Sequence, residues 1–268
     1  MLYNKIMRQN TGQALLITIM LLAVALTVVL AMSYTSKTDV QLSKLEEENQ
    51  RALAAAEAGI DALVNKTTGE SVVISDLSSG LANFTGTAEK ATVAQPEFTS
   101  PLLQANGHYM LYLSGYPGFL SPYNGTINIY YSNDQSKCTS SASGDAIEIT
   151  VISGFSYPYT ITRYLSDGGE RVVSGTNDYL SAGDYTIDGL GFKCKTKPIS
   201  ISSSGNPKIM VVRSIFNPSR IGFEGSSSLP AQGTVITSEA KTPSGVTKKI
   251  KLFQSYPQIP LEFFTTSF

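Results

Sequence analysis

The sequence predicts an α+β protein in which a long N-terminal helix, membrane-spanning and then amphipathic, is followed by a mainly antiparallel β head. Two observations predict the helix: an uninterrupted apolar run from Ala14 to Met32, and apolar residues that recur at helical spacing beyond it. A third predicts the head: from about Gly69 onward Ser, Thr, Gly, Tyr and β-branched residues dominate, with turn signals roughly every 8–12 residues. The 268 residues are 42% apolar and 15% charged, which suits one or two compact domains and excludes a disordered polymer.

The apolar run has the length of a membrane-spanning helix. It covers about 19 residues, close to the ~20 that cross a bilayer and longer than the ~7–15 of a cleavable signal core. Lys5 and Arg8 precede it without any acidic residue, and no charge follows until Lys37. Because basic residues favour the cytoplasmic side, we expect a single-pass anchor that places the head outside the cytoplasm.

The helix is expected to continue beyond the membrane. We assign residues 13–66 to it, with 13–36 membrane-spanning, because neither Gly nor Pro occurs from Gln13 until Gly59. The outer part is amphipathic, since its apolar residues are spaced by threes and fours or their sums: Leu42, Leu45, Leu53, Ala56, Ile60 and Leu63. The charged residues around them are expected to form a solvated face: Asp39, Lys44, Glu46, Glu47, Glu48 and Arg51.

This arrangement resembles a known family. A short basic leader ending in Gly12, a cleavage point before Gln13, an apolar helix and an amphipathic continuation resemble a type IV prepilin, the substrate of the prepilin peptidase. Residues 50–59, Gln-Arg-Ala-Leu-Ala-Ala-Ala-Glu-Ala-Gly, closely resemble the Ala-Ala-Glu-Ala stretch of PilX-type minor pilins and secretion pseudopilins. A looser likeness to PilX-like proteins rests on short segments that start at Met210, Leu229 and Gln254.

The resemblance implies a route and a set of partners. The leader, residues 1–12, would be removed by the prepilin peptidase, and the new N-terminus at Gln13 would be N-methylated. The helix would sit first in the cytoplasmic membrane and then among the helices of other pilin subunits in an extracellular filament. The head would be displayed at the cell surface for adhesion or another surface role.

Two positions depart from the family pattern. Gln13 stands where main pilins usually have Phe, and Ile17 stands at the fifth mature position, where they have Glu. The missing carboxylate is shared with the pseudopilin thought to cap the filament tip in type II secretion. The resemblance therefore implies a minor pilin at the tip or in initiation of assembly. Two alternatives stay open: a type II secretion pseudopilin, and a membrane-tethered surface-binding or hydrolytic domain that never enters a filament.

The remainder of the chain is divided into a linker or loop, 67–101, and a β-rich extracytoplasmic head, 102–268, with two possible subdomains at 102–200 and 201–268. Within the head, alternation places Ile147, Ile149 and Val151 on one face of a strand. Hairpin turns are expected at 153–156 and 242–245. The expected strands are 108–113, 126–131, 145–152, 159–165, 208–216, 220–223, 233–240 and 247–254.

Cys138 and Cys194 are the only cysteines, and both follow the anchor. In an oxidising compartment two thiols most simply form one disulfide, which would stabilise the head by about 4 kcal/mol. The alternative is two independent buried thiols.

The sequence predicts no enzyme and no cofactor. His108 is the only histidine, so any Ser-His-Asp or Cys-His mechanism would depend on it, and no nucleophile-elbow motif accompanies it. No Gly-rich phosphate loop leads into a helix. We therefore expect His108 to be an ordinary strand-end residue.

Three groups of side chains suggest ligands, each with a simpler structural explanation. Carboxylates in Gly-rich turns could cage calcium, but they are also ordinary turn residues: Asp167, Glu170, Asp184 and Asp188. Lysines near Phe192 and Phe253 could hold single-stranded DNA, but they also suit an exposed sheet edge: Lys193, Lys195, Lys197, Lys248, Lys249 and Lys251. Six of the 14 tyrosines could form an adhesive surface, but alternating Tyr also packs in half-buried strands: Tyr109, Tyr112, Tyr116, Tyr123, Tyr130 and Tyr131. The stretch from Tyr116 to Tyr123 is expected to be the most exposed.

Overall fold

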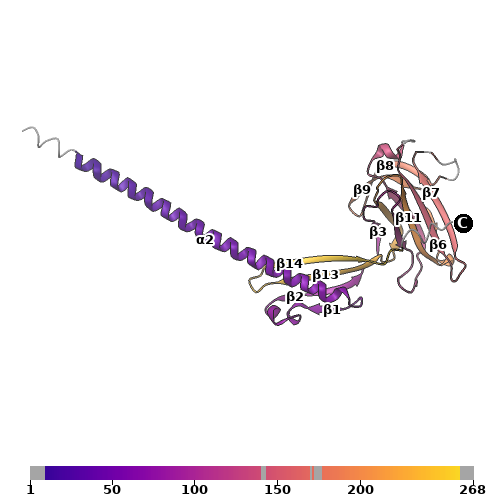
Figure 1. Cartoon of the computed structure of the whole chain (residues 1–268), viewed down its shortest axis with the longest axis horizontal. Helices are drawn as coiled ribbons and strands as arrows, with labels where there is room; N and C mark the ends of the chain where they lie inside the picture. Colours follow the sequence, from indigo (N-terminus) through magenta and orange to yellow (C-terminus); the bar gives the residue numbers. More distant parts are fainter. Residues whose placement is uncertain (1–9, 140–142, 170, 172–176, 260–268) are drawn as a thin grey trace, which may run out of the picture. The chain divides into compact units, whose positions relative to one another are not determined.

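The computed structural model describes residues 10–139, 143–169, 171 and 177–259, and it has the predicted α+β fold. One long helix, α2 (Asn10–Val64), is followed by strands that pair antiparallel almost throughout (Figure 1). The chain forms two compact units. Among the described residues, the first comprises the helix with 71–89 and 237–250, and the second comprises 66–70, 90–236 and 251–259.

The first unit packs the last turns of α2 on a small sheet. Its strand order is β1 (Ser71–Val73), β2 (Thr85–Thr92), β13 (Gly233–Lys241) and β14 (Thr247–Ser255), and the short 3-10 turns η1 (Ile74–Asp76) and η2 (Ser79–Leu81) connect β1 to β2. The helix contributes one buried stripe at spacings of three and four residues, made of Ala52, Ala55, Ala56, Gly59, Ile60 and Leu63. Small residues on this stripe let the helix backbone approach the sheet closely.

Gly59 is the point of closest approach between helix and sheet. A Cβ at this position would lie 2.4 Å from Ser238 Oγ, 2.8 Å from Ile74 Cδ1 and 3.0 Å from Ala88 Cβ. Glycine is an unfavourable residue inside a helix, by ~1 kcal/mol relative to alanine. Its presence at the end of the Ala-rich segment is explained by this contact.

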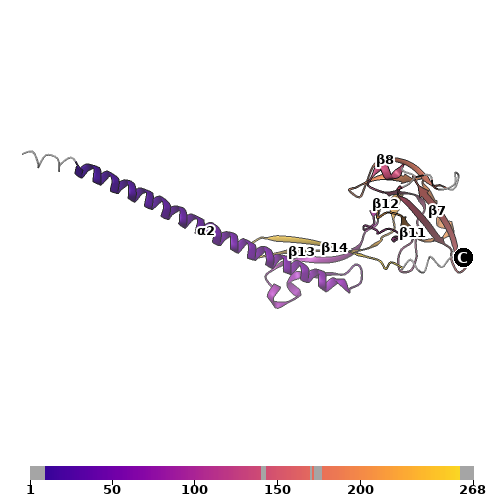
Figure 2. The same cartoon turned by 45° about the horizontal axis from the view of Figure 1, so that its top comes forward.

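The second unit is built from two sheets. One has the order β3 (Gln95–Thr99), β12 (Ile221–Leu229), β5 (Gly125–Tyr131), β9 (Leu190–Thr196) and β8 (Tyr179–Ile187), with β10 (Ile199–Ile201) also pairing with β5. The other has the order β4 (His108–Tyr112), β11 (Pro207–Ile215), β6 (Ala146–Ser153) and β7 (Thr160–Asp167). Buried side chains of both sheets, such as Tyr131, Phe223, Ile149 and Met210, form one core, so the sheets are the two layers of a sandwich (Figure 2).

The strand register of the sheet β4-β11-β6-β7 defines its two faces. Ile147, Ile149 and Val151 belong to the core, which confirms that they share a face. On the outer face, directly opposed partners make rows across the four strands. One row is Tyr112, Ile209, Ile152 and Ile161; the next is Met110, Val211, Thr150 and Arg163; the third is His108, Arg213, Glu148 and Leu165.

The expected strands overlap with observed ones, and the hairpin at 153–156 is confirmed by the β6–β7 pairing. The prediction of a loop over 67–101 was wrong, because β1, β2 and β3 lie there. Strands β8, β9 and β10 were also missed. These strands are short or carry few apolar alternations, and they form because each finds a distant partner: β2 lies beside β13, and β3 lies beside β12.

The expected division of the head at 200/201 does not match the strand pairing. Strand β11 lies between β4 and β6, and β12 lies between β3 and β5. The segment 201–268 therefore completes the sheets of 102–200 instead of forming a subdomain of its own. Its remaining described strands, β13 and β14, belong to the sheet that packs on the helix.

We predict that Gly59→Ala lowers the free energy of unfolding by about 1–3 kcal/mol, as overpacking does, although alanine is the better helix former. Thermal unfolding of the full chain in a mild detergent measures this. In a Ser238→Ala background, Gly59→Ala should lower the free energy of unfolding by less, because Ser238 Oγ, the atom nearest to the new methyl group, is absent. Gly80→Ala in the same unit is the control, because a Cβ there meets only ordinary contact at 3.8 Å. An equal effect of the two Ala variants would contradict the close approach.

Candidate functional site

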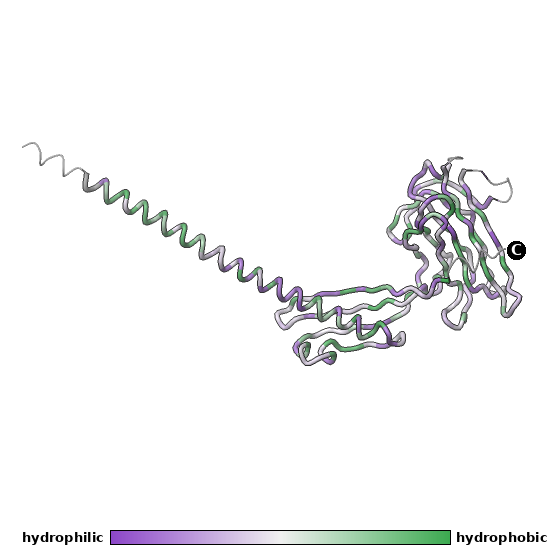
Figure 3. The backbone as a smooth tube through the Cα atoms, viewed as in Figure 1, coloured by the Kyte–Doolittle hydropathy of each residue, from purple (hydrophilic) through white to green (hydrophobic). Residues whose placement is uncertain are grey.

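The first half of α2 exposes an apolar surface on every side. The large apolar side chains between Leu15 and Met32 are 46–68% exposed, and none of the most apolar 18-residue window is buried by the described chain. Figure 3 shows that this stretch of the helix consists mostly of hydrophobic residues. This is the single helix among the described residues that is long and apolar enough to cross a membrane. Full burial of one such side chain is worth about 1.5–3 kcal/mol, so this surface requires an apolar environment.

The threonines of this half are satisfied within the helix. The hydroxyls of Thr18, Thr27 and Thr35 donate to the carbonyls three residues earlier, at 2.8, 2.8 and 2.9 Å. The hydroxyl protons therefore need no partner outside the helix. These threonines are compatible with hydrocarbon or with the packed core of a helical assembly.

Ile17 is an apolar, 56% exposed residue on this surface. No acidic side chain occurs on the helix before Asp39, so this part of the surface offers no negative charge to a neighbour. Thr18, next to Ile17, has a hydroxyl proton committed to Leu15 O, and its oxygen remains an acceptor.

The predicted processing point, Gly12 and Gln13, lies two to three residues inside the observed helix, which starts at Asn10. Residues 1–9 of the predicted leader lie outside the described residues. Glycine at position 12 weakens this first turn by up to ~1 kcal/mol relative to alanine.

The Ala-rich segment that carries the family resemblance lies on the sheet-facing side of α2. Ala52, Ala55 and Ala56 are fully buried, whereas Glu57, the next residue along the helix, is exposed. One turn earlier, Ser244 Oγ donates to Glu48 at 2.8 Å, and this hydrogen bond lowers the pKa of the Glu48 carboxyl below its usual value. The motif therefore has a structural role in fixing the helix to its sheet.

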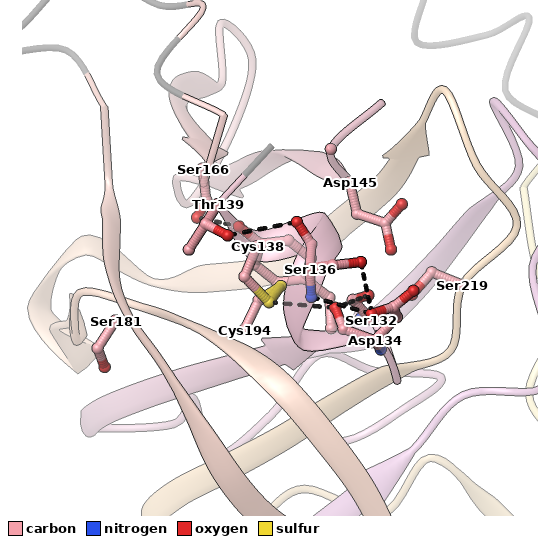
Figure 4. The surroundings of a disulfide bond; sticks show 12 residues. Ser132, Asp134, Ser136, Cys138, Thr139, Asp145, Ser166, Ser181, Cys194 and Ser219 are labelled. Atoms are coloured by element: carbon pink, nitrogen blue, oxygen red, sulfur yellow. Dashed lines mark hydrogen bonds between the residues drawn. A yellow bond between two sulfur atoms is a disulfide. The ribbon is translucent and has the colours of Figure 1, made fainter. Parts of the chain in front are cut away.

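The predicted disulfide between Cys138 and Cys194 is present, with a Cα to Cα distance of 5.5 Å (Figure 4). It joins the 3-10 turn η3 (Gln135–Cys138) to β9, and both cysteines are fully buried in the core. Asp134 begins the turn by accepting from Ser136 N at 2.9 Å and Ser136 Oγ at 2.7 Å, which lowers the Asp134 pKa. The bridge holds a loop that has few other apolar anchors.

The acidic candidates for calcium are placed in separate interactions. Asp167 is buried against Arg171 at 2.8 Å; burial alone would raise its pKa, but hydrogen bonds from Arg171 and Gly169 lower it below the usual value. Asp184 pairs with Lys193, and Asp188 accepts from Thr99 Oγ1 at 3.1 Å. Glu170 lies outside the described residues. Across the described ranges, no group of three His, Cys, Asp or Glu residues is placed to hold a metal ion.

His108 begins β4, as expected for a strand-end residue. Its Nε2 lies 2.8 Å from Ile259 O, so the ring contacts the described end of the chain.

The lysines of β9 are engaged by groups of the same unit. Lys193 pairs with Asp184, and Lys195 Nζ lies 5.2 Å from the ring centre of Tyr130. Lys197 donates to Asn177 O at 2.8 Å. Strand β9 lies inside its sheet, so the edge-protection explanation does not apply to these lysines. Phe192 beside them is buried and offers no stacking face to a base.

The second lysine group lies on β14, which is an edge strand. Lys249 pairs with Glu239 at 3.3 Å, and Lys251 is exposed. Lysines on an edge strand discourage the addition of another strand. This placement matches the structural explanation for Lys248, Lys249 and Lys251.

Most of the predicted tyrosine surface is core. Five of the six tyrosines are at most 4% exposed, and Tyr116 is 37% exposed. Burial, with Tyr116 and Tyr256 nearby, raises the pKa of Tyr112 to about 12. The tyrosines therefore mainly pack, as the alternation suggested.

Three strongly exposed aromatic side chains lie at or beside the β6–β7 turn, which the sequence analysis expected as a hairpin turn but not as an aromatic surface. Phe155 is 79%, Tyr157 86% and Tyr159 49% exposed. Gly154 at the start of the turn donates its N–H to Asn206 O at 3.0 Å. The signal available in the sequence was the absence of any charged residue between Glu148 and Arg163 in a turn rich in aromatic residues.

Comparisons with known proteins add no family to these observations. No protein-family model, curated protein or solved structure matches the chain.

We predict that Cys138→Ser lowers the melting temperature of the full chain by on the order of 10 °C, because a bridge across this loop is worth about 4 kcal/mol. The oxidised protein should contain no thiol that an alkylating reagent labels before reduction. Addition of a reductant should lower the melting temperature of the natural chain to that of the variant, and it should leave the melting temperature of the variant unchanged. Two labelled thiols in the unreduced protein would contradict the bridge.

Proposed function

We propose that this chain is a minor pilin of a type IV pilus, whose helix packs in the filament core and whose β units are displayed outside the cell. The observation that carries the proposal is the division of α2 into two kinds of surface. Its first half is apolar on all sides and uncovered, and its last turns pack on a sheet of the same chain. A subunit of this kind can move from a bilayer into a bundle of like helices without exposing apolar area to water.

The leader and the Ala-rich segment support the same proposal. The basic head, Gly12 and Gln13 resemble a prepilin processing point, and Ala52, Ala55 and Ala56 lie where the helix meets its sheet. The extracytoplasmic side is supported by the disulfide, because such bonds persist mainly in oxidising compartments. The proposed role is assembly and display, without catalysis.

A secretion pseudopilin is the second candidate, and Ile17 favours it. In pilins the carboxylate at the fifth mature position is thought to meet the N-terminal ammonium of a neighbouring subunit. Ile17 offers no carboxylate, as in the tip pseudopilin. A tethered domain that never enters a filament is the third candidate, and it would retain Met1 in the mature protein.

We predict that Gly12→Leu leaves the leader attached and abolishes surface display, because the peptidase requires a small residue before the cut. Intact-mass analysis of membrane fractions measures this. The natural chain should begin at Gln13, and Gly12→Ala should be cleaved at least in part. A natural chain that retains Met1, or a Gly12→Leu chain of unchanged mature mass, would contradict the prepilin proposal.

We also predict that the subunit is present in only a few copies per filament. Without a carboxylate at Ile17 it cannot neutralise an ammonium above it, and an unpaired charge in a packed core costs several kcal/mol. Its own ammonium can still be paired by the subunit added below, so it is suited to enter first. Quantitative mass spectrometry of sheared filaments decides this.

Ile17→Glu should increase the copy number along the shaft, whereas Leu16→Glu, one position away, should not. Abundance of the natural chain comparable to the main pilin would refute the tip position. It would leave membership in the filament intact.

A further inference from the structure

One edge of the sheet β4-β11-β6-β7 is closed by side-chain amides. The backbone groups of Met110 and Tyr112 point away from β11, and each finds an amide that replaces a neighbouring strand. Gln258 accepts from Met110 N at 2.7 Å and donates to Met110 O at 3.2 Å. Gln232 does the same for Tyr112, at 2.7 and 2.9 Å. Strand addition at β4 is therefore blocked.

The opposite edge, β7, is closed over only half of its length. Asn177 accepts from Asp167 N at 2.9 Å and donates to Asp167 O at 2.6 Å. Asp178 accepts from Leu165 N through its side chain and donates its own N–H to Leu165 O at 2.7 Å. The outward backbone groups at these two positions are thus occupied.

The backbone groups of successive residues in a strand alternate in direction, so the N–H and C=O groups of Ile161 and Arg163 also point away from β6, as those of Leu165 and Asp167 do. Figure 1 shows β7 as the outermost strand, beside β6. The recorded hydrogen bonds of the described residues give these two positions no outward partner. Ile161 is 54% exposed, Arg163 is exposed, and no ion pair within the described ranges includes Arg163. An unprotected edge of this kind is a template for another strand.

We propose that the open edge of β7 binds residues 260–268 of a second copy of this chain as an added antiparallel strand. That segment lies outside the described residues, and its sequence is Pro-Leu-Glu-Phe-Phe-Thr-Thr-Ser-Phe. The side chains of Ile161 and Arg163 both lie on the outer face of the sheet, the face turned away from the core. Their neighbours on β6 are Ile152 and Thr150. The edge therefore selects a strand that carries a carboxylate and an apolar side chain two residues apart.

One register satisfies these requirements. Glu262 opposite Arg163 places Phe264 opposite Ile161, so a charge pair and an apolar pair lie side by side on one face. On the other face, Leu261 falls opposite Tyr164, which packs against the core. In the same register the added strand ends at Leu261, because Asp178 already occupies the outward side of Leu165, and Pro260, which has no N–H to satisfy, leaves the edge there.

The strand must come from a second copy because the same chain cannot reach this register. Gln258 is bound at the outer edge of β4, so a strand added outside β7 lies at least four strand spacings away, or at least about 19 Å. The four residues from Gln258 to Glu262 span at most about 14 Å when fully extended. A contact between unlike surfaces of identical chains can repeat from one copy to the next, as it does in a filament. The strand pairing itself does not require that the chain be part of a filament.

Disulfide trapping tests the proposal in the full chain in mild detergent. In the register above, position 162 faces 263 as a non-hydrogen-bonded pair, with Cα atoms about 4.5 Å apart, which suits a disulfide. A mixture of Thr162→Cys and Phe263→Cys chains should form a disulfide-linked heterodimer on mild oxidation. Phe264→Cys in place of Phe263→Cys is the control, because its side chain would lie on the opposite face.

Exchange of the charges at positions 163 and 262 then distinguishes specific strand pairing from chance collision of the two cysteines. Arg163→Glu should slow formation of the heterodimer at least tenfold, and Glu262→Arg on the partner should restore it to within about threefold. Arg220→Glu, an exposed site elsewhere in the same unit, should have no effect. A heterodimer that forms at equal rates with position 264, or that ignores the charge at position 163, would overturn the proposal. So would a chain carrying both cysteines that closes only on itself.

Discussion

The apolar surface of α2 between Leu15 and Met32 is the constraint on which the rest of the molecule depends. It cannot remain in water, because each large side chain left exposed forgoes about 1.5–3 kcal/mol. No element of the described chain covers it, and it is long and apolar enough to cross a membrane. The threonines of this stretch return their hydroxyl protons to the helix, which keeps the surface compatible with lipid or with other apolar helices. The other end of the helix is attached to a sheet of the same chain.

That attachment is made by the smallest side chains of the helix. Ala52, Ala55, Ala56 and Gly59 bring the backbone against a sheet whose strands come from distant parts of the sequence. The same short segment therefore carries the family resemblance and a packing requirement. In the second unit, the Cys138–Cys194 bridge further limits the conformational freedom of the chain, because it ties a 3-10 turn to β9 inside the core.

The edges of the sheet β4-β11-β6-β7 are controlled mainly by side chains that imitate a neighbouring strand. The amides of Gln258, Gln232 and Asn177 each satisfy both the N–H and the C=O of one edge residue. Lysines on β14 act by charge instead. The uncapped positions of β7 stand out against this pattern. Their neighbours, the exposed aromatic residues of the β6–β7 turn, extend the same apolar region along the chain.

The sequence by itself determined the features that depend on local patterning. The apolar run, the helical spacing through Leu63 and the alternation around Ile149 are properties of neighbouring residues, and the structure has the helix and the strand they predict. The cysteines left two possibilities, and only the fold decided that they meet. The strands over 67–101, the place of β11 between β4 and β6, and the capping of Met110 by Gln258 were likewise decided by the tertiary structure. Each joins residues far apart in the chain, and no local preference encodes which distant backbone groups will be left to satisfy.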